Sequence, residues 1–200
     1  MLEPEPSEKS GWHRWSPGDQ NEPVTTLYLM VGLPGAGKTT RAEALAARHG
    51  ALRLTPDVWM IPLFGASDPD GKRDVLEGRL ISVALQALRL GTSVVLDFGF
   101  WGRDERSSLR ALATSAGASA EVIYLAVDSE TQLARVADRW NEAPEHTFSM
   151  TAAEIEANHA IFQVPDVAEL AGEQVPMAPA GSGGWAAWAA KRWPSLNRIG

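Results

Sequence analysis

Residues 27–40 read LYLMVGLPGAGKTT, and most of the expected architecture follows from them. The first five residues form a continuous apolar run, which is typical of a β-strand buried on both faces. Residues 32–39 then satisfy the pattern G-x-x-x-x-G-K-[ST] in full. An amphipathic helix is expected next, because apolar positions repeat at helical spacing up to Gly50. A buried strand, a glycine loop and a helix in this order predict a P-loop.

The residue types of this loop suit the binding of a nucleoside triphosphate. Its glycines let successive backbone N–H groups approach phosphate oxygens, and the helix N-terminus adds partial positive charge. Lys38 is expected to reach the β- and γ-phosphates of ATP, and the Thr39 hydroxyl is expected to ligate Mg²⁺. The predicted nucleotide-binding residues are Gly32, Leu33, Pro34, Gly35, Ala36, Gly37, Lys38, Thr39 and Thr40. The loop alone does not distinguish a kinase from an ATPase switch.

Strand and helix patterns alternate along the rest of the chain. Further apolar runs occupy residues 93–96 and 122–126, and residues 51–54 are a weaker strand candidate. Helical periodicity fills the gaps between them, and a capping box from Thr151 to Glu154 predicts one more helix. Such alternation predicts an α/β fold, a three-layer α/β/α sandwich with a mostly parallel sheet.

The chain divides into one predicted domain and two flanking segments. Residues 1–23 carry turn formers and few aliphatic side chains, which predicts a flexible N-terminal arm. Residues 24–170 are the expected P-loop domain. Residues 171–200 form a C-terminal extension, in which a glycine-rich joint precedes Trp185, Trp188 and Trp193 at roughly helical spacing. This tryptophan-rich helix is expected either to dock on the domain or to contact a partner protein.

Composition narrows the possible functions. The 200 residues carry a formal net charge of −7 and only four lysines, which disfavours a protein that grips extended nucleic acid. The absence of cysteine excludes disulfides, thiolate metal sites and cysteine nucleophiles. No apolar run is long enough for a membrane span and no secretory signal is visible, so a cytoplasmic protein is expected.

Two carboxylates follow predicted strands, at the edge where ligands bind in open α/β sheets. Asp57 comes after residues 51–54, and Asp97 closes the strand at 93–96. Phosphoryl transfer to an alcohol needs a group that orients the hydroxyl and accepts its proton, and Asp57 is placed for that role. A helix N-cap is the alternative for Asp57. Asp97 is expected to hold Mg²⁺ or its water, with acceptor contact or a structural role as alternatives.

Aromatic side chains follow both carboxylates. Walls of this kind with a few polar groups suit a flat or partly apolar ligand, so they are expected to line the acceptor half of a cleft. Packing beneath a lid is the alternative for the rings, and a solvated side chain is the alternative for the one arginine among these residues. The predicted acceptor-binding residues are Asp57, Trp59, Phe98, Phe100, Trp101 and Arg103.

The succession GLPGAGKTT, LTPDVW, VVLDFGF and RDERSSLRALA resembles a broad family of P-loop kinases. That family includes polynucleotide 5′-hydroxyl kinases, zeta-type toxins that phosphorylate UDP-sugars, and chloramphenicol phosphotransferase. The resemblance covers roughly residues 25–170. It implies a sheet like that of nucleoside monophosphate kinases, a catalytic base equivalent to Asp57 and a mobile lid bearing arginines after the fourth strand.

Arg135 and Arg139 fall in the region of this implied lid, one helical turn apart. As lid residues they would neutralise charge on the transferring phosphoryl group. Pairing with nearby surface acids is the alternative. The sequence departs from the family after Pro165, where a further core strand is usual and only Gln174 and Val175 offer one.

These features together predict an ATP- and Mg²⁺-dependent phosphotransferase. The expected acceptor is a hydroxyl of a small molecule such as an antibiotic, a nucleotide sugar or another metabolite. Two alternatives stay open: a polynucleotide 5′-hydroxyl kinase, and a non-catalytic ATP-binding switch or interaction module that uses the tryptophan-rich tail. No base-reading motif distinguishes ATP from GTP.

Overall fold

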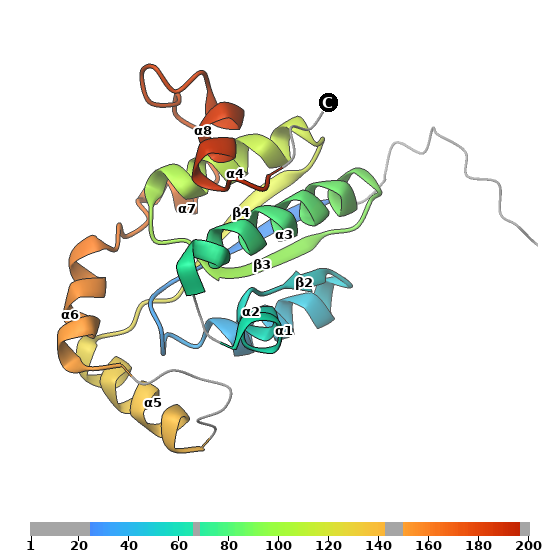
Figure 1. Ribbon diagram of the computed structural model, residues 1–200. Helices are drawn as coiled ribbons and strands as arrows, with labels where there is room; N and C mark the ends of the chain where they lie inside the picture. The colour runs from blue at the N-terminus through green and yellow to red at the C-terminus, as the bar shows by residue number, and fades with distance from the viewer. Residues whose placement is uncertain (1–24, 66–68, 143–149, 197–200) are drawn as a thin grey trace, which may run out of the picture.

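A sheet of four parallel strands forms the centre of the computed structural model, which describes residues 25–65, 69–142 and 150–196 (Figure 1). The strands are β1 (Thr26–Val31), β2 (Leu52–Leu54), β3 (Val94–Gly99) and β4 (Ser119–Tyr124), in the order β2-β3-β1-β4. All three neighbouring pairs run parallel, so the carboxyl ends of the strands share one edge. The predicted α/β fold with a parallel sheet is confirmed.

Helices separate the strands and continue beyond the last one. They are α1 (Lys38–His49), α2 (Asp57–Phe64), α3 (Lys72–Arg89), α4 (Arg103–Ser115), α5 (Ser129–Glu142), α6 (Ala152–Ile161), α7 (Val167–Leu170) and α8 (Trp185–Arg192), with a short 3₁₀ turn at Pro69–Gly71. Among the described residues, none of these helices is long and apolar enough to cross a membrane.

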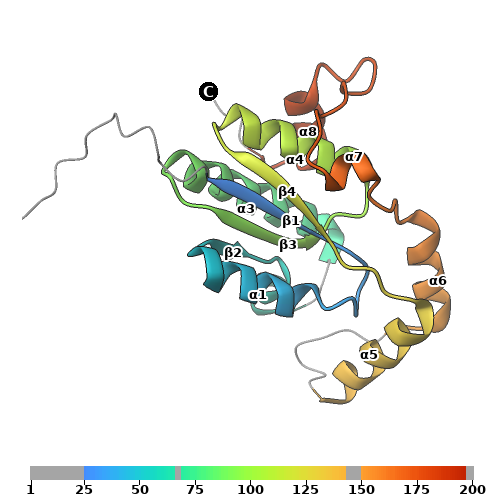
Figure 2. The same cartoon turned by 180° about the vertical axis from the view of Figure 1, so that it is seen from behind.

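The strands present alternate residues to two separate cores. Leu27, Leu29 and Val31 of β1 lie in the larger core, together with apolar side chains of α3, α4 and the C-terminal segment. Tyr28 and Met30 point to the opposite face, where they pack with α1. The period of two residues along β1 therefore assigns α3 and α4 to one layer and α1 to the other. Figure 2 shows α1 across the sheet from α3 and α4.

Helices α5 and α6 lie side by side beyond the carboxyl edge of the sheet (Figures 1 and 2). A hydrogen bond of 2.7 Å joins Gln132 Oε1 on α5 to His159 Nε2 on α6. Thr151 is the N-cap of α6, and its side chain forms with that of Glu154 the capping box expected from the sequence. The two helices follow β4, the region in which the resemblance implies a lid. Residues 143–149 lie outside the described residues.

The C-terminal segment is part of the main core. Trp193 is fully buried and Ala189 and Leu196 join the same apolar cluster. A Cβ added at Gly78 of α3 would come within 2.5 Å of Ser195 Oγ, so the segment lies directly against that helix. Residues 171–200 were expected as an extension of the domain, and their described part contributes side chains to its core. Within the described residues, no strand follows β4, so Gln174 and Val175 do not extend the sheet.

Candidate active site

The glycine loop connects β1 to α1 at the carboxyl edge of the sheet. Gly32 N donates to Gly99 O at the end of β3 at 3.2 Å, which ties the start of the loop to the neighbouring strand. The first bond of α1 runs from Arg41 N to Gly37 O at 3.2 Å. Backbone N–H groups ahead of that bond have no partner within the helix and are available to an anion. Lys38 Nζ donates to Leu33 O at 2.9 Å, so the lysine lies across the loop.

The glycines of the loop leave room for phosphate oxygens. Gly37 has φ +87° and a Cβ added there would meet no atom within 4 Å, so the space above it is open. Gly32 is needed for a different reason, since a Cβ there would come within 2.7 Å of Leu125 O. These observations fit the binding of a triphosphate, with Thr39 exposed at the same helix N-terminus. No group of three metal-ligating His, Asp or Glu side chains occurs in the described parts of the chain. A Mg²⁺ ion bound largely by phosphate, hydroxyl and water oxygens needs no such group.

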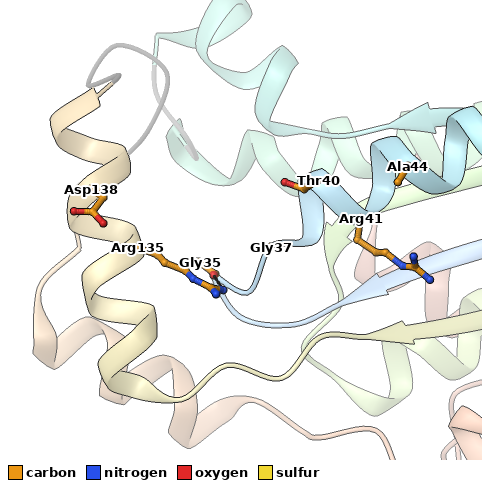
Figure 3. Close-up of a pocket in the computed structure, with 7 residues that line it drawn as sticks. All are labelled: Gly35, Gly37, Thr40, Arg41, Ala44, Arg135 and Asp138. Carbon is orange, nitrogen blue, oxygen red and sulfur yellow. Dashed lines mark hydrogen bonds between the residues drawn. The ribbon is translucent and has the colours of Figure 1, made fainter.

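Helix α5 packs against the tip of the loop. Arg135 Nη1 donates to Gly35 O at 3.1 Å, and a Cβ added at Gly35 would lie 3.3 Å from Gln132 O. A cavity of about 640 Å³ opens beside this contact (Figure 3). The Thr40 hydroxyl of α1 points toward α5 in Figure 3, where Asp138 lies on α5. The residues that line the cavity are Gly35, Gly37, Thr40, Arg41, Ala44, Arg135 and Asp138.

This cavity lies beside the loop, between α1 and α5. Two of the residues predicted for the site, Thr40 and Arg135, are among those that line it. The backbone of Arg139 lies in α5, one turn beyond Arg135, but its side chain is outside the described residues.

Asp97 lies inside β3, which runs to Gly99 and thus further than the apolar pattern predicted. The pairing of β1 with β3 shifts between Leu29↔Leu96 and Val31↔Gly99, so a bulge falls at Asp97. Bulges of this kind redirect side chains and are common beside active sites. The Asp97 side chain is only 3% exposed and accepts from Arg53 Nη2 at 2.8 Å.

The Arg53 guanidinium supplies the cation that a buried carboxylate needs. Arg53 comes from β2 and also binds Glu43 on α1, at 3.2 Å. A Mg²⁺ ion or its water would therefore share Asp97 with an arginine that the sequence did not suggest. The bond to Arg53 uses Asp97 Oδ2, which leaves Oδ1 for that role.

Asp57 lies at the carboxyl end of β2, in the first turn of α2. Pro56 takes the N-cap position, and the Asp57 side chain makes no capping hydrogen bond. Its carboxylate is 65% exposed and Oδ1 accepts from Arg73 Nη1 of α3 at 2.9 Å. The structure thus favours an open carboxylate held by a cation over the capping alternative.

Arg73 bridges two carboxylates. Its Nε also donates to Glu77 Oε1, one turn along α3, at 3.1 Å. Glu77 is buried, and this burial raises its pKa to about 7, although the Arg73 charge and the Trp193 hydrogen bond act in the opposite direction. The neighbouring carboxylates raise the pKa of Arg73 despite its own burial.

The aromatic residues after β3 separate into buried and accessible groups. Phe100 is 4% exposed, stacks on Phe98 with ring centroids 5.1 Å apart, and belongs to the main core. It has φ +36°, a strained value for a bulky residue, and Arg106 Nη1 donates to its carbonyl at 3.2 Å. Trp101 is half-buried, and a Cβ at Gly99 would lie 3.4 Å from its Nε1 and 3.7 Å from Lys38 Cε. Trp101 therefore borders the P-loop, whereas the Phe100 ring does not line an open surface.

Two other predicted acceptor residues differ in their surroundings. Trp59 is exposed on α2, among the apolar side chains Val58, Leu63 and Phe64. Arg103 opens α4, and its Nη2 lies 2.6 Å from Asp166 Oδ2, an ion pair that the sequence analysis did not predict.

Several residues of the site carried no sequence signal. Arg53 and Arg73 reach the two predicted carboxylates from elsewhere in the chain, and Glu77 holds Arg73. Arg106 is fully buried, forms two hydrogen bonds of 2.8 and 2.9 Å with Glu169, and fixes the loop after β3. Each of these charged residues lies in a helix or strand at a position where the sequence pattern is equally consistent with a solvated surface side chain. Only the polar types at otherwise apolar positions of β2 and α4 hinted at a role.

Comparison with protein families gives a direct result. AAA_33, a family described as an AAA domain, matches residues 27–165, which is more than half of the chain. The chain belongs to the AAA_33 family. The match covers the P-loop, both carboxylates and α5, and it agrees with the resemblance to P-loop kinases. No curated protein sequence matches the chain.

Solved structures share the fold of this AAA_33 protein. A kinase candidate from Chloroflexus aurantiacus j-10-fl is 20% identical, with a TM-score of 0.55 over 80% of this chain and 85% of that one. Kti12 from Chaetomium thermophilum in complex with ADP-AlF3 is 18% identical, with a TM-score of 0.56 over 86% and 100%. A chain of the Pnkp1/Rnl/Hen1 RNA repair complex is 16% identical, with a TM-score of 0.57 over 82% of this chain and 54% of that one. At these identities the likeness shows a P-loop kinase-like fold.

Proposed function

We propose that this AAA_33 protein transfers the γ-phosphate of ATP to a hydroxyl group of a small molecule. The observation that carries the proposal is that a complete phosphate-binding loop and an exposed carboxylate, Asp57, follow parallel strands of one sheet. Parallel strands end at the same edge, so the two groups face the same region. A nucleotide switch needs the first of these groups and has no use for the second.

The P-loop half of the site would hold ATP and Mg²⁺. Backbone N–H groups at the start of α1 and the Lys38 ammonium would bind the β- and γ-phosphates after Lys38 leaves Leu33 O. The Thr39 hydroxyl and Asp97 Oδ1, directly or through water, would hold Mg²⁺. A Mg²⁺ ion held there would neutralise charge on the phosphates. Arg135 lies at the loop tip and adds a cation close to the phosphates.

Asp57 would act on the acceptor. The hydroxyl oxygen attacks the γ-phosphorus as the bond from that phosphorus to the bridging oxygen of ADP breaks. The hydroxyl proton passes to Asp57. Oδ1 of Asp57 is held by Arg73, which leaves Oδ2 to orient the hydroxyl. The products are ADP and a phosphate monoester.

Two observations support a small acceptor. The net charge of −7 gives no general attraction for a polynucleotide backbone. Helix α2, whose first turn carries Asp57, exposes Trp59 and other apolar side chains, which suit a compact and partly apolar molecule. Kti12 in complex with ADP-AlF3 and a chain of an RNA repair complex have related folds. The two alternatives, a non-catalytic ATP-binding module and a polynucleotide 5′-hydroxyl kinase, are therefore separate outcomes of the test.

The proposal is tested with γ-labelled ATP, Mg²⁺ and a panel of acceptors. The panel contains nucleosides, 5′-hydroxyl oligonucleotides, UDP-sugars, aminoglycoside and phenicol antibiotics, and a metabolite extract. Wild type is compared with Lys38→Ala and Asp57→Asn. Label on one small molecule, lost in both variants, is the expected result.

Two other outcomes of this experiment would overturn the proposal. Label on oligonucleotides alone would assign a polynucleotide kinase. Label released only as free phosphate, at the same rate in wild type and Asp57→Asn, would leave a nucleotide switch.

A further inference from the structure

The C-terminal segment reaches the acceptor half of the site through a continuous chain of hydrogen bonds. Trp193 Nε1 donates to Glu77 Oε2 at 3.1 Å, and Glu77 Oε1 accepts from Arg73 Nε at 3.1 Å. Arg73 Nη1 then donates to Asp57 Oδ1 at 2.9 Å. Four side chains from α2, α3 and the end of the chain thus form one path, and 136 positions separate Asp57 from Trp193 in the sequence.

The inner end of this path is rigid and the outer end is open. Trp193 is fully buried and Glu77 is 7% exposed, whereas the Asp57 side chain is 65% exposed. Arg73 lies between them with a quarter of its side chain exposed. An arginine at such a boundary can adopt many rotamers. Restricting it to one of them costs conformational entropy, which its contacts must offset. The bond to Glu77 fixes its Nε, so the guanidinium presents Nη1 toward Asp57.

The C-terminal segment is itself firmly attached at this point. Arg192 pairs with Asp74 at 2.6 Å and with Glu105 at 2.7 Å, and Arg79 Nη1 donates to Ser195 O at 3.0 Å. Gly78, next to Glu77, is where the segment approaches α3 most closely. A glycine at this position in the middle of a helix lowers helix stability, but it allows the backbone of the segment to lie against α3.

We propose that Glu77 and Trp193 are positioning residues for Asp57: they fix the Arg73 guanidinium, which holds the Asp57 carboxylate in the orientation for accepting the acceptor's proton. This inference rests on the proposed function for the role of Asp57. It gives the C-terminal segment a role in the acceptor half of the site, to which the phosphate-binding loop does not contribute. Neither residue touches the reacting groups.

The ionisation of Glu77 gives the path a pH dependence. Burial raises the pKa of Glu77 to about 7, and the charged groups around it are Arg73 on its own helix, Arg192 on the C-terminal segment and Glu105 on α4. Asp57 and Asp74 lie one step further away, bound to Arg73 and Arg192. The ionised form is the better acceptor for both donors, so the path is complete above about pH 7.

Glu77→Gln and Trp193→Phe test the path on the full-length protein. Glu77 uses both oxygens, one for each donor, and an amide has only one acceptor oxygen. Phe keeps a large ring and removes the N–H. Glu156→Gln and Trp185→Phe are matched controls. Glu156 is exposed on α6, and Trp185 Nε1 donates to Pro176 O, so neither belongs to the path.

The first readout is hydrogen exchange at Arg73 Nε–H, measured by nuclear magnetic resonance and assigned with Arg73→Lys. Weakening the bond from Arg73 Nε to Glu77 should accelerate exchange about tenfold in Glu77→Gln. Trp193→Phe keeps that bond but removes the donor that fixes Glu77, so a smaller acceleration is expected there, with the controls unchanged. The second readout is the rate of γ-phosphate release from Mg·ATP to water between pH 6 and 8. With a pKa of about 7 for Glu77, wild type should gain about tenfold over this range, and Glu77→Gln should lose that rise.

Unchanged exchange at Arg73 in both variants, or a wild-type pH profile in Glu77→Gln, would overturn the inference. If Trp193→Phe does not fold, Glu77→Gln alone decides, since it is nearly isosteric. The proposed function fails separately, when Asp57→Asn transfers phosphate at the wild-type rate while the Arg73 signal responds as expected.

Discussion

The two halves of the candidate site are built differently. The nucleotide half comes from one contiguous stretch of sequence and is proposed to bind largely through backbone groups, with α5 added at its tip. The acceptor half comes from side chains of α2, α3 and the C-terminal segment, which meet only in the folded chain. A loop that binds through its own backbone amides depends little on the side chains around it. A site made of long polar side chains depends on every element that holds them, including one as distant as Trp193.

This difference also explains what the sequence could predict. Asp57 and Asp97 were found because they follow strands, and Lys38 because its motif has fixed spacing. Arg73 and Glu77 sit in a long helix where charged residues are normally solvated, so no spacing marks their contact with Asp57. The strand at residues 51–54 was predicted only weakly, because β2 is short and carries Arg53, which pairs with Asp97.

The boundary of the domain at residue 170 was also drawn from composition. Glycine-rich residues 181–184 resemble a linker, but Trp193 and Leu196 beyond them fill the main core. A sequence pattern cannot reveal that Gly78 leaves space for the C-terminal segment to pack against α3.

The largest expected effect is in the nucleotide half. Lys38→Ala should reduce phosphoryl transfer about 10⁴-fold, because a cation that meets charge on the transferring group is lost. Lys191→Ala, at an exposed position on α8, is the control and should leave the rate unchanged. Radiolabel transfer at saturating ATP measures both. A loss below tenfold in Lys38→Ala would show that the loop does not act on the γ-phosphate.

The next prediction concerns the contribution of the C-terminal segment to the stability of the core. Trp193→Ala should lower the free energy of unfolding by about 3–5 kcal/mol, since a fully buried indole is replaced by a cavity. Trp185→Ala, at a half-buried position in the same segment, should cost about 1 kcal/mol. Urea unfolding of both variants gives the values. Equal effects would mean that the C-terminal segment is not part of the core.

The buried carboxylate should make stability depend on pH. Burial raises the pKa of Glu77 from 4.5 to about 7, so the folded protein binds this proton more tightly than the unfolded chain. The free energy of unfolding should therefore fall as pH rises from 4.5 to 7, by at most about 3 kcal/mol, and then level off. Glu77→Gln should lose this component, whereas Glu156→Gln, at an exposed position on α6, should keep it. Unfolding curves at several pH values in wild type and both variants measure it, and equal slopes in wild type and Glu77→Gln would contradict the assignment.

A smaller effect, on ATP affinity, is expected at the cavity between α1 and α5. Arg135→Ala should weaken ATP binding about tenfold, because the guanidinium at Gly35 no longer adds a cation near the phosphates. Arg89→Ala, at the exposed end of α3, is a control of the same type. Calorimetric titration with Mg·ATP compares them, and equal affinities would remove Arg135 from the site.

The central claim is that the two halves have separate tasks, and Asp57→Asn tests it most directly. Mg·ATP affinity and transfer to the identified acceptor should be measured on the same preparation, with Asp70→Asn as an exposed control on the 3₁₀ turn. The account predicts ATP affinity within about twofold of wild type and transfer reduced about 10²–10⁴-fold, the usual contribution of a general base. Transfer at the wild-type rate in Asp57→Asn would contradict the account, because the acceptor half would then contain no base at this position.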